Sequence, residues 1–156
     1  MSGVLQCVLD PPSRHLPHRD PAPETRDGLP VRNILIVDDS DFERNVIRTA
    51  VEGLTRLRVC GEAANGAEAI QKALQLKPDL VVMDLAMPLM NGVEAAMVLR
   101  NAMPKVPIVL FTLYAEQLRG AISQAFGVTL IVSKTDGLAA LLGSVETLLA
   151  RDRVEP

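Results

Sequence analysis

The sequence predicts an α/β protein built on an open, doubly wound parallel sheet. From Val31 onward, short apolar runs alternate with helical patterns, and each kind occurs five times. The runs at 33–38, 78–84 and 107–112 are apolar on both faces, as in central strands that helices cover on both sides. Because crossovers between parallel strands are right-handed, this alternation places helices on both faces of one sheet.

The elements are expected in a strict strand-then-helix order. The strand candidates are 33–38 (NILIVD), 57–63 (LRVCGEA), 78–84 (PDLVVMD), 107–112 (PIVLFT) and 129–134 (TLIVSK), and the helix candidates are 40–54, 65–74, 91–102, about 115–124 and a leucine-rich segment from Asp136. Ser40 with Glu43, and Asn91 with Glu94, have the spacing of capping boxes at two helix starts.

The composition is that of one globular domain with a sizeable core. Of the 156 residues 48% are hydrophobic but only 3% aromatic, so an aliphatic core is expected. No apolar run approaches the roughly 20 residues of a membrane span, and the first ten residues lack the basic flank of a signal peptide. The net charge of −3, without a basic block, argues against direct nucleic-acid binding. Cys7 and Cys60 give no disulfide framework, so a cytoplasmic location is expected.

Residues 1–31 differ from the rest of the chain. They include a proline-rich segment that also holds both histidines, His15 and His18, and they show no apolar periodicity. Such a segment cannot bury enough surface to offset its ordering entropy, so a disordered tail is predicted before a domain at 32–151 and a short C-terminal tail at 152–156. A docking arm, or a metal pair formed by the two histidines, is the alternative for the first segment.

Polar side chains follow the predicted strands at the points where the strands end. Asp38 and Asp39 end the first strand, Asp84 the third, Thr112 the fourth and Lys134 the fifth. Ligands of open α/β sheets bind beyond the carboxyl ends of the strands. Three carboxylates, a hydroxyl and an ammonium are therefore expected to converge there, although each alone has an ordinary structural explanation as a cap, a strand end or a surface charge.

The energetics of such a cluster favour a bound cation. Two carboxylates about 4 Å apart repel by roughly 4 kcal/mol at an effective dielectric near 20. Oxygen ligands without histidine or cysteine point to Mg²⁺, which keeps waters and phosphate oxygens as its remaining ligands. An aspartate beside Mg²⁺ can attack phosphorus, and a nearby lysine and threonine can hold the transferred group.

With these residues in place, the chain resembles a receiver domain of bacterial two-component response regulators over about residues 32–151. ILIVDDS resembles the acidic pair after the first strand of that family, and DLAMPLMNG its phosphorylation-site pattern. VLFT and IVSK match its switch threonine and its lysine. The resemblance implies a flavodoxin-like (βα)5 fold with strand order 2-1-3-4-5, an arrangement for which a chemotaxis member of this family is a standard illustration.

The resemblance also implies residue roles. Asp84 would accept a phosphoryl group from a phosphohistidine on a sensor kinase or phosphotransfer protein. Asp39, Asp84 and the backbone carbonyl of Ala86 would ligate Mg²⁺, with Asp38 acting through water. Thr112 and Lys134 would hold the phosphoryl group. The face of helix 4, strand 5 and helix 5 would serve a homodimer or an effector, and the chain itself is expected not to be an enzyme beyond its own phosphorylation and dephosphorylation.

Three positions depart from the family pattern. Ile131 stands where many receivers carry an aromatic residue, Thr135 follows the lysine where proline is common, and Leu113 follows the switch threonine where a small residue often leaves access to the aspartate. Such departures recur in the group that usually carries a helix-turn-helix output domain. They lead to the hypothesis of a phosphorylatable receiver with slowed phosphoryl exchange and an atypical switch.

Two functions remain as alternatives. The chain could be a receiver-like module that binds a partner without phosphorylation. It could also be a Mg²⁺-dependent phosphatase of the haloacid dehalogenase type, because Asp39 and Asp41 have the spacing of that family's acidic pair. That chemistry needs further acids after the lysine, which are not evident in the sequence.

Overall fold

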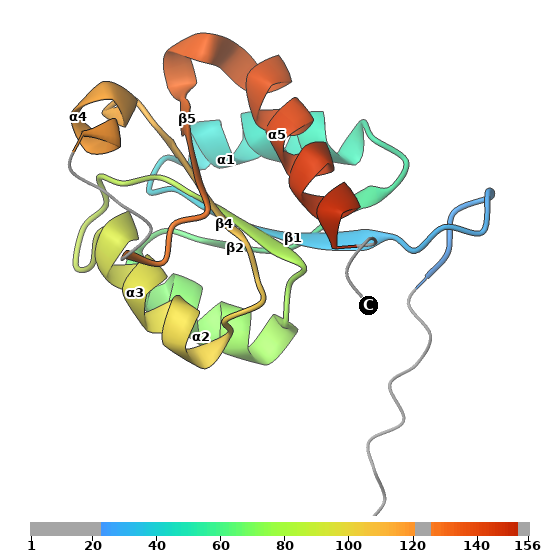
Figure 1. Ribbon diagram of the computed structural model, residues 1–156, viewed down its shortest axis with the longest axis horizontal. Helices are drawn as coiled ribbons and strands as arrows, with labels where there is room; N and C mark the ends of the chain where they lie inside the picture. The colour runs from blue at the N-terminus through green and yellow to red at the C-terminus, as the bar shows by residue number, and fades with distance from the viewer. Residues whose placement is uncertain (1–22, 121–125, 153–156) are drawn as a thin grey trace, which may run out of the picture.

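The computed structural model describes residues 23–120 and 126–152, whose strands form one five-stranded parallel sheet in the order β2-β1-β3-β4-β5 (Figure 1). The strands are β1 (Arg32–Val37), β2 (Leu57–Ala63), β3 (Leu80–Met83), β4 (Ile108–Thr112) and β5 (Leu130–Ser133). The strand order predicted from the resemblance is confirmed. The order reverses between β1 and β3, and such a switch point is where open α/β sheets bind ligands.

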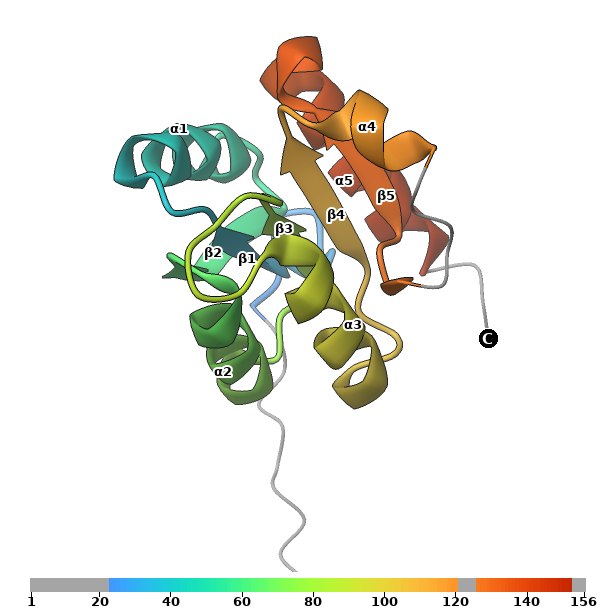
Figure 2. The same ribbon diagram turned by 90° about the vertical axis from the view of Figure 1, so that its left-hand side faces the viewer.

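Helices cover both faces of this sheet (Figures 1 and 2). They are α1 (Asp41–Glu52), α2 (Gly66–Leu76), α3 (Gly92–Ala102), α4 (Ala115–Arg119) and α5 (Gly137–Arg151), the last preceded by the 3-10 turn η2 (Lys134–Asp136). The pair α1 and α5 lies on one face, α2 and α3 lie on the other, and α4 lies beside β5. The predicted helix at 115–124 corresponds to α4, and residues 121–125 are outside the described part.

The core is two aliphatic layers, one on each side of the sheet. Ile34 and Ile36 face Ile47 of α1 and Leu141 of α5 in one layer. In the other layer, alternate residues of the same strand pack against small side chains of α2 and α3, including Ala69, Ala73, Ala95 and Ala96. The near absence of aromatic residues therefore has a structural counterpart, because alanines let α2 and α3 lie close to the sheet.

The predicted capping box at Ser40 forms only by half. The Ser40 hydroxyl accepts a hydrogen bond from the Glu43 backbone N–H (3.3 Å), as expected. The Ser40 N–H, however, donates to the Asp38 carboxylate (2.9 Å), and the Glu43 side chain turns to Lys134 instead. The second half of that prediction was wrong because a buried ammonium competes for Glu43. At α3, both halves of the box at Asn91 and Glu94 are present.

Much of the predicted N-terminal tail lies outside the described residues. His15, His18 and Cys7 fall in 1–22, and residues 153–156 of the C-terminal tail are also outside. Residues 23–31 make a turn in which Glu24 bridges Pro30 and the Val31 N–H donates to the Pro23 carbonyl (2.9 Å). Within 23–120 and 126–152, no helix has the length and apolar character needed to cross a bilayer.

Candidate functional site at the carboxyl edge of the sheet

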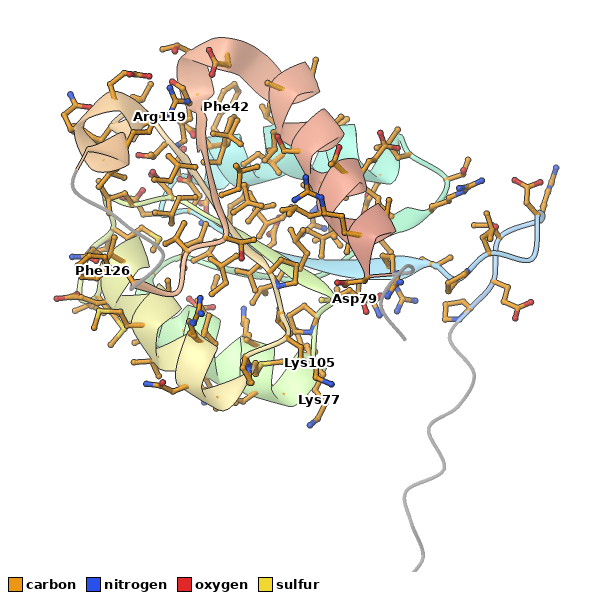
Figure 3. All side chains as sticks on the ribbon, in the orientation of Figure 1. Phe42, Lys77, Asp79, Lys105, Arg119 and Phe126 are labelled. Atoms are coloured by element: carbon orange, nitrogen blue, oxygen red, sulfur yellow. The ribbon has the colours of Figure 1, made fainter. Side chains whose placement is uncertain are left out.

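The parallel strands deliver five polar side chains to one edge of the sheet. Asp38 and Asp39 follow β1, Asp84 follows β3, Thr112 ends β4, and Lys134 follows β5. The first helix after this edge carries Phe42, and Figure 3 shows Phe42 at the end of the molecule opposite Asp79 and Lys105. The site is thus assembled from residues 38 to 134 by strand order alone.

Three carboxylates meet at this edge. One oxygen each of Asp38, Asp39 and Asp84 lies within 4.8 Å of the others. Asp38 is 2% exposed and Asp84 9%, whereas Asp39 is open to solvent. The structure therefore brings together the acids that the sequence singled out, with two of them largely removed from water and one at the mouth.

The Lys134 ammonium bridges the two buried acids. Its Nζ lies 2.8 Å from Asp38 Oδ2 and 3.4 Å from Asp84 Oδ2, and it also donates to Glu43. Burial alone lowers the pKa of a lysine, but the hydrogen bonds to Asp38 and Glu43 and the charge of Asp84 more than offset this and hold the pKa of Lys134 above its ordinary value. Lys134 is accordingly charged across the neutral range.

Asp84 is the acid most affected by its surroundings. Burial raises the pKa of Asp84, and repulsion by Asp38 adds to this, while Lys134 and the Leu85 N–H act in the opposite direction. That N–H donates to Asp84 Oδ1 at 2.7 Å, which fixes the rotamer and leaves Oδ2 on the side of Lys134. A carboxylate held in this way presents one oxygen to an incoming electrophile.

Thr112 and Ala86 occupy less direct positions. Thr112 is fully buried, and its hydroxyl accepts a hydrogen bond from the Tyr114 backbone N–H (3.2 Å) rather than contacting the acids. Ala86 lines an open hollow of about 680 Å³ beside Asp39, together with Tyr114. The hollow gives the acidic cluster an approach from solvent.

The residues that depart from the expected pattern are also placed. Leu113 is 63% exposed and lies with Phe42, Glu43 and Lys134 around a second depression of about 260 Å³, between α1 and the start of α5. Ile131 is half-buried against the α3 side of the core. Tyr114, rather than Leu113, borders the hollow at Asp39, so the access position predicted for Leu113 falls to its neighbour.

The loop after Asp84 is held by a close backbone contact. The Gly92 N–H donates to the Leu85 carbonyl (2.9 Å), and a Cβ added at Gly92 would lie 2.2 Å from the Asp84 carbonyl oxygen. Only glycine fits at this position, which explains the final residue of the DLAMPLMNG motif. The start of α3 is thereby fixed against the candidate phosphoacceptor.

Sequence reasoning missed the role of two α1 residues. Glu43 was assigned to the helix cap, and its carboxylate instead reaches Lys134. Arg44 received no role, yet its guanidinium donates to the Asp38 carbonyl (2.5 Å) and pairs with Asp41 and Glu62. The only local signal was the helical spacing that places residues 43 and 44 in the first turn. Asp41 is exposed and paired with Arg44, so it does not join Asp39 as the phosphatase alternative requires.

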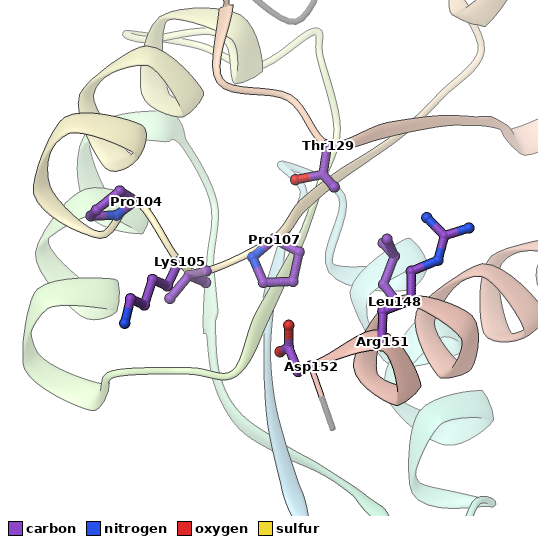
Figure 4. Close-up of a pocket in the computed structure, with 8 residues that line it drawn as sticks. Pro104, Lys105, Pro107, Thr129, Leu148, Arg151 and Asp152 are labelled. Atoms are coloured by element: carbon purple, nitrogen blue, oxygen red, sulfur yellow. The ribbon is translucent and has the colours of Figure 1, made fainter. Parts of the chain in front are cut away.

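A separate cavity of about 290 Å³ lies at the opposite edge of the sheet (Figure 4). It is lined by Lys105 and Pro107 before β4, Thr129 before β5, and Arg151 near the end of α5. The Thr129 hydroxyl is already occupied, because it accepts from the Ile108 N–H at 2.9 Å. This cavity contains none of the acids described above and is not the candidate site.

The fold and the site together define a doubly wound domain with an acidic pocket bridged by a lysine, the arrangement that the resemblance attributes to phospho-accepting receivers. The family model described as the response regulator receiver domain matches residues 34–146. The chain belongs to this family, and the predicted recognition, fold class and signalling function are confirmed.

Three similar proteins illustrate the range of the family. The chain is 45% identical over 78 residues to a protein-glutamate methylesterase/protein-glutamine glutaminase of Methanosarcina acetivorans, covering 50% of this chain and 22% of that protein. A two-component response regulator of the LuxR family from Aurantimonas sp. SI85-9A1 has a TM-score of 0.70 at 31% identity, covering 77% of this chain and 86% of that one. The Thermotoga maritima response regulator TrrA, solved with Mg²⁺ and beryllium fluoride, has a TM-score of 0.69 at 28% identity, covering 76% and 99%.

These relatives correct one expectation. The chain was expected not to be an enzyme, yet curated relatives that it matches at about 40% identity are named as methylesterase/glutaminases. The prediction was wrong because a receiver pattern describes the input domain and carries no information on a catalytic domain joined to it. The chain spans only 20–25% of the length of these relatives.

Proposed function

We propose that Asp84 accepts a phosphoryl group from a phosphohistidine of a sensor kinase or phosphotransfer protein. In the transfer, the bond between histidine nitrogen and phosphorus breaks, a bond between Asp84 oxygen and phosphorus forms, and the histidine leaves with the electron pair of the broken bond. The observation that carries this proposal is the position of Asp84, which is largely buried, is oriented by the Leu85 N–H and lies 3.4 Å from the Lys134 ammonium.

The acidic cluster suits Mg²⁺. Its donors are all oxygen atoms, and three of them already lie within one small sphere, as a hard cation requires. Asp39, Asp84 and the Ala86 carbonyl would be direct ligands and Asp38 would act through water. The ion, when bound, supplies positive charge for the developing phosphoryl oxygens. Support comes from the donor set of this chain and from the Mg²⁺ complex of the similar TrrA protein.

Lys134 and Thr112 would stabilise the transferred group. The Lys134 ammonium is buried, charged and already beside Asp84, so it neutralises the added negative charge without a large movement. Thr112 would have to turn its hydroxyl from the Tyr114 N–H toward the phosphoryl group. Such a rotation is the coupling by which phosphorylation would alter the neighbouring surface.

The proposal extends to domain bounds, partners and location. Residues 32–151 would form the receiver, with tails at 1–31 and 152–156, and the protein would act in the cytoplasm, where sensor kinases present their phosphohistidine. The face of α4, β5 and α5 would be the place of a homodimer or effector contact. The aliphatic stripe of α5 is compatible with this, although its buried members Leu141, Val145 and Leu149 face the core.

A beryllofluoride titration tests this function. With Mg²⁺ present, beryllofluoride should shift the backbone NMR signals around Asp84, Thr112 and Lys134, and Asp84→Asn should abolish these shifts. An unchanged response in Asp84→Asn would reject Asp84 as the acceptor. No response in the wild-type chain would instead favour the alternative, an interaction module that binds its partner without phosphorylation.

The curated relatives suggest a second proposal, concerning output. Because they are named methylesterase/glutaminases and match this chain over the receiver, we propose that this receiver can control an esterase of that class. A chimera tests it: residues 32–151 replace the receiver of one such enzyme, and hydrolysis of a glutamate-methylated peptide is followed. Beryllofluoride with Mg²⁺ should change the rate, and the same chimera with Asp84→Asn should not respond. A rate independent of beryllofluoride in both would reject the proposal.

A further inference from the structure

Three carboxylates share the single ammonium of Lys134 in this structure. Asp38 Oδ2 lies 2.8 Å from Nζ, Asp84 Oδ2 lies at 3.4 Å, and Glu43 forms the third contact. Asp38 and Asp84 each accept another hydrogen bond, from the N–H of Ser40 and of Leu85 respectively. Glu43 has Lys134 as its hydrogen-bond partner among the described side chains. An ammonium has three protons, so all three are engaged before any phosphoryl group arrives.

The geometry of α1 aims Glu43 at Lys134. Glu43 lies in the first turn of α1, and its backbone N–H is held by the Ser40 hydroxyl. The usual partner of a carboxylate at this position is the N–H of the capping residue, but here the Asp38 carboxylate accepts from the Ser40 N–H. The Glu43 carboxylate is thereby released from capping and extends across the edge of the sheet to β5.

The three acids differ in what it costs to leave Lys134. Asp38 is almost completely buried, so losing the ammonium would leave an unpaired charge away from water. Asp84 is the proposed acceptor, and its contact is the longest of those with printed distances here. The Glu43 side chain is the most exposed of the three, so its carboxylate can return to water at low cost.

We propose that Glu43 is a positioning residue that holds Lys134 in the unphosphorylated state and gives it up when a phosphoryl group forms on Asp84. Glu43 then opposes phosphorylation and sets the balance between the two states. This inference rests on the proposed function of Asp84. It requires a Lys134 that exchanges one oxygen partner for another, with Asp38 kept as the fixed contact.

Binding of beryllofluoride in Mg²⁺ tests the proposal, with the full chain and Glu43→Gln, which preserves size and removes the charge. Asp41→Asn is the matched control, because Asp41 also lies in the first turn of α1 but pairs with Arg44. Glu43→Gln should bind beryllofluoride about fivefold more tightly than the wild-type chain, which is the scale of a partly exposed ion pair. Asp41→Asn should change this affinity by less than about twofold, the general effect of removing one nearby exposed charge.

The ammonium signal of Lys134 provides a readout that a merely structural role would not move. In the wild-type chain, its NMR resonance should shift on adding beryllofluoride, and in Glu43→Gln it should begin closer to the loaded position. Equal affinities and equal starting positions in Glu43→Gln and Asp41→Asn would overturn the proposal while leaving Asp84 as acceptor. A wild-type chain with no beryllofluoride response would overturn the proposed function and the role of Glu43 with it.

Discussion

At the scale of single residues, the site is built from charges that oppose one another in the absence of a ligand. Asp38 and Asp84 are both buried beside Lys134, and burial raises the pKa of Asp84. A group whose folded pKa lies above its unfolded value contributes stability that is present below the unfolded pKa and is lost as the pH rises through the folded pKa. Ionised Asp84 is therefore a cost to the unliganded fold at neutral pH.

Replacement of Asp84 by asparagine should stabilise the protein in Mg²⁺-free buffer at pH 7, by roughly 1 kcal/mol in free energy of unfolding, because Lys134 keeps Asp38 and Glu43 as partners. The gain should shrink as the pH falls toward 4, where wild-type Asp84 becomes protonated. Urea unfolding at several pH values measures both. A destabilised Asp84→Asn at pH 7 would contradict this account of the site.

The two residues after Thr112 should affect access differently. Tyr114 borders the hollow beside Asp39, whereas Leu113 lies in the depression next to Phe42. Tyr114→Ala should speed phosphorylation by a small donor such as phosphoramidate, by roughly threefold, because it clears the approach to the acceptor. Leu113→Ala should leave that rate nearly unchanged. The opposite ranking would restore the hypothesis that Leu113 restricts access.

At the scale of elements, the most constrained junction is the one between the Asp84 loop and α3. A Cβ at residue 92 would overlap the Asp84 carbonyl oxygen. Gly92→Ala should therefore lower the free energy of unfolding by about 1–3 kcal/mol and weaken Mg²⁺ binding, because the loop must move.

Gly143 is the matched control for this prediction. It lies inside α5, and a Cβ there meets nothing within 4 Å. Gly143→Ala should stabilise the protein by about 1 kcal/mol through helix propensity, with Mg²⁺ binding unchanged. Denaturant unfolding and a Mg²⁺ titration of both variants make the comparison. Equal effects at the two positions would contradict the close contact at Gly92.

The sequence predicted these elements well where a local pattern decides them. Apolar runs such as LVVM form β3, and the Asn91–Glu94 spacing forms the complete cap of α3. Glu43 could not be predicted in the same way, because its partner Lys134 is 91 positions away in the chain. The convergence of Asp38, Asp84 and Lys134 was predictable, since parallel strands bring their carboxyl ends to one edge. The burial that separates Asp38 from Asp39 was not.

At the scale of the whole molecule, the sheet order places the start of α1, the loop after β3 and the turn after β5 around one acidic cluster. A ligand that joins these segments binds the folded state alone, and so stabilises it by mass action. Mg²⁺ at ten times its dissociation constant should raise the free energy of unfolding by about 1.4 kcal/mol.

Asp39→Asn should remove most of this stabilisation, because Asp39 is the solvent-facing member of the cluster. Asp41→Asn is again the control, since Asp41 is exposed and lies outside the cluster. Thermal unfolding with and without Mg²⁺ gives the comparison. Full stabilisation of Asp39→Asn by Mg²⁺ would place the ion elsewhere.

The most direct measurement is the covalent state of Asp84 after incubation with phosphoramidate and Mg²⁺, followed by intact-protein mass spectrometry. The account predicts that one phosphoryl group is added to the wild-type chain, that it is lost in alkali as an acyl phosphate should be, and that Asp84→Asn does not acquire it. A wild-type chain that stays unmodified, or an Asp84→Asn variant that is modified equally, would contradict the assignment of Asp84 as the phosphoacceptor.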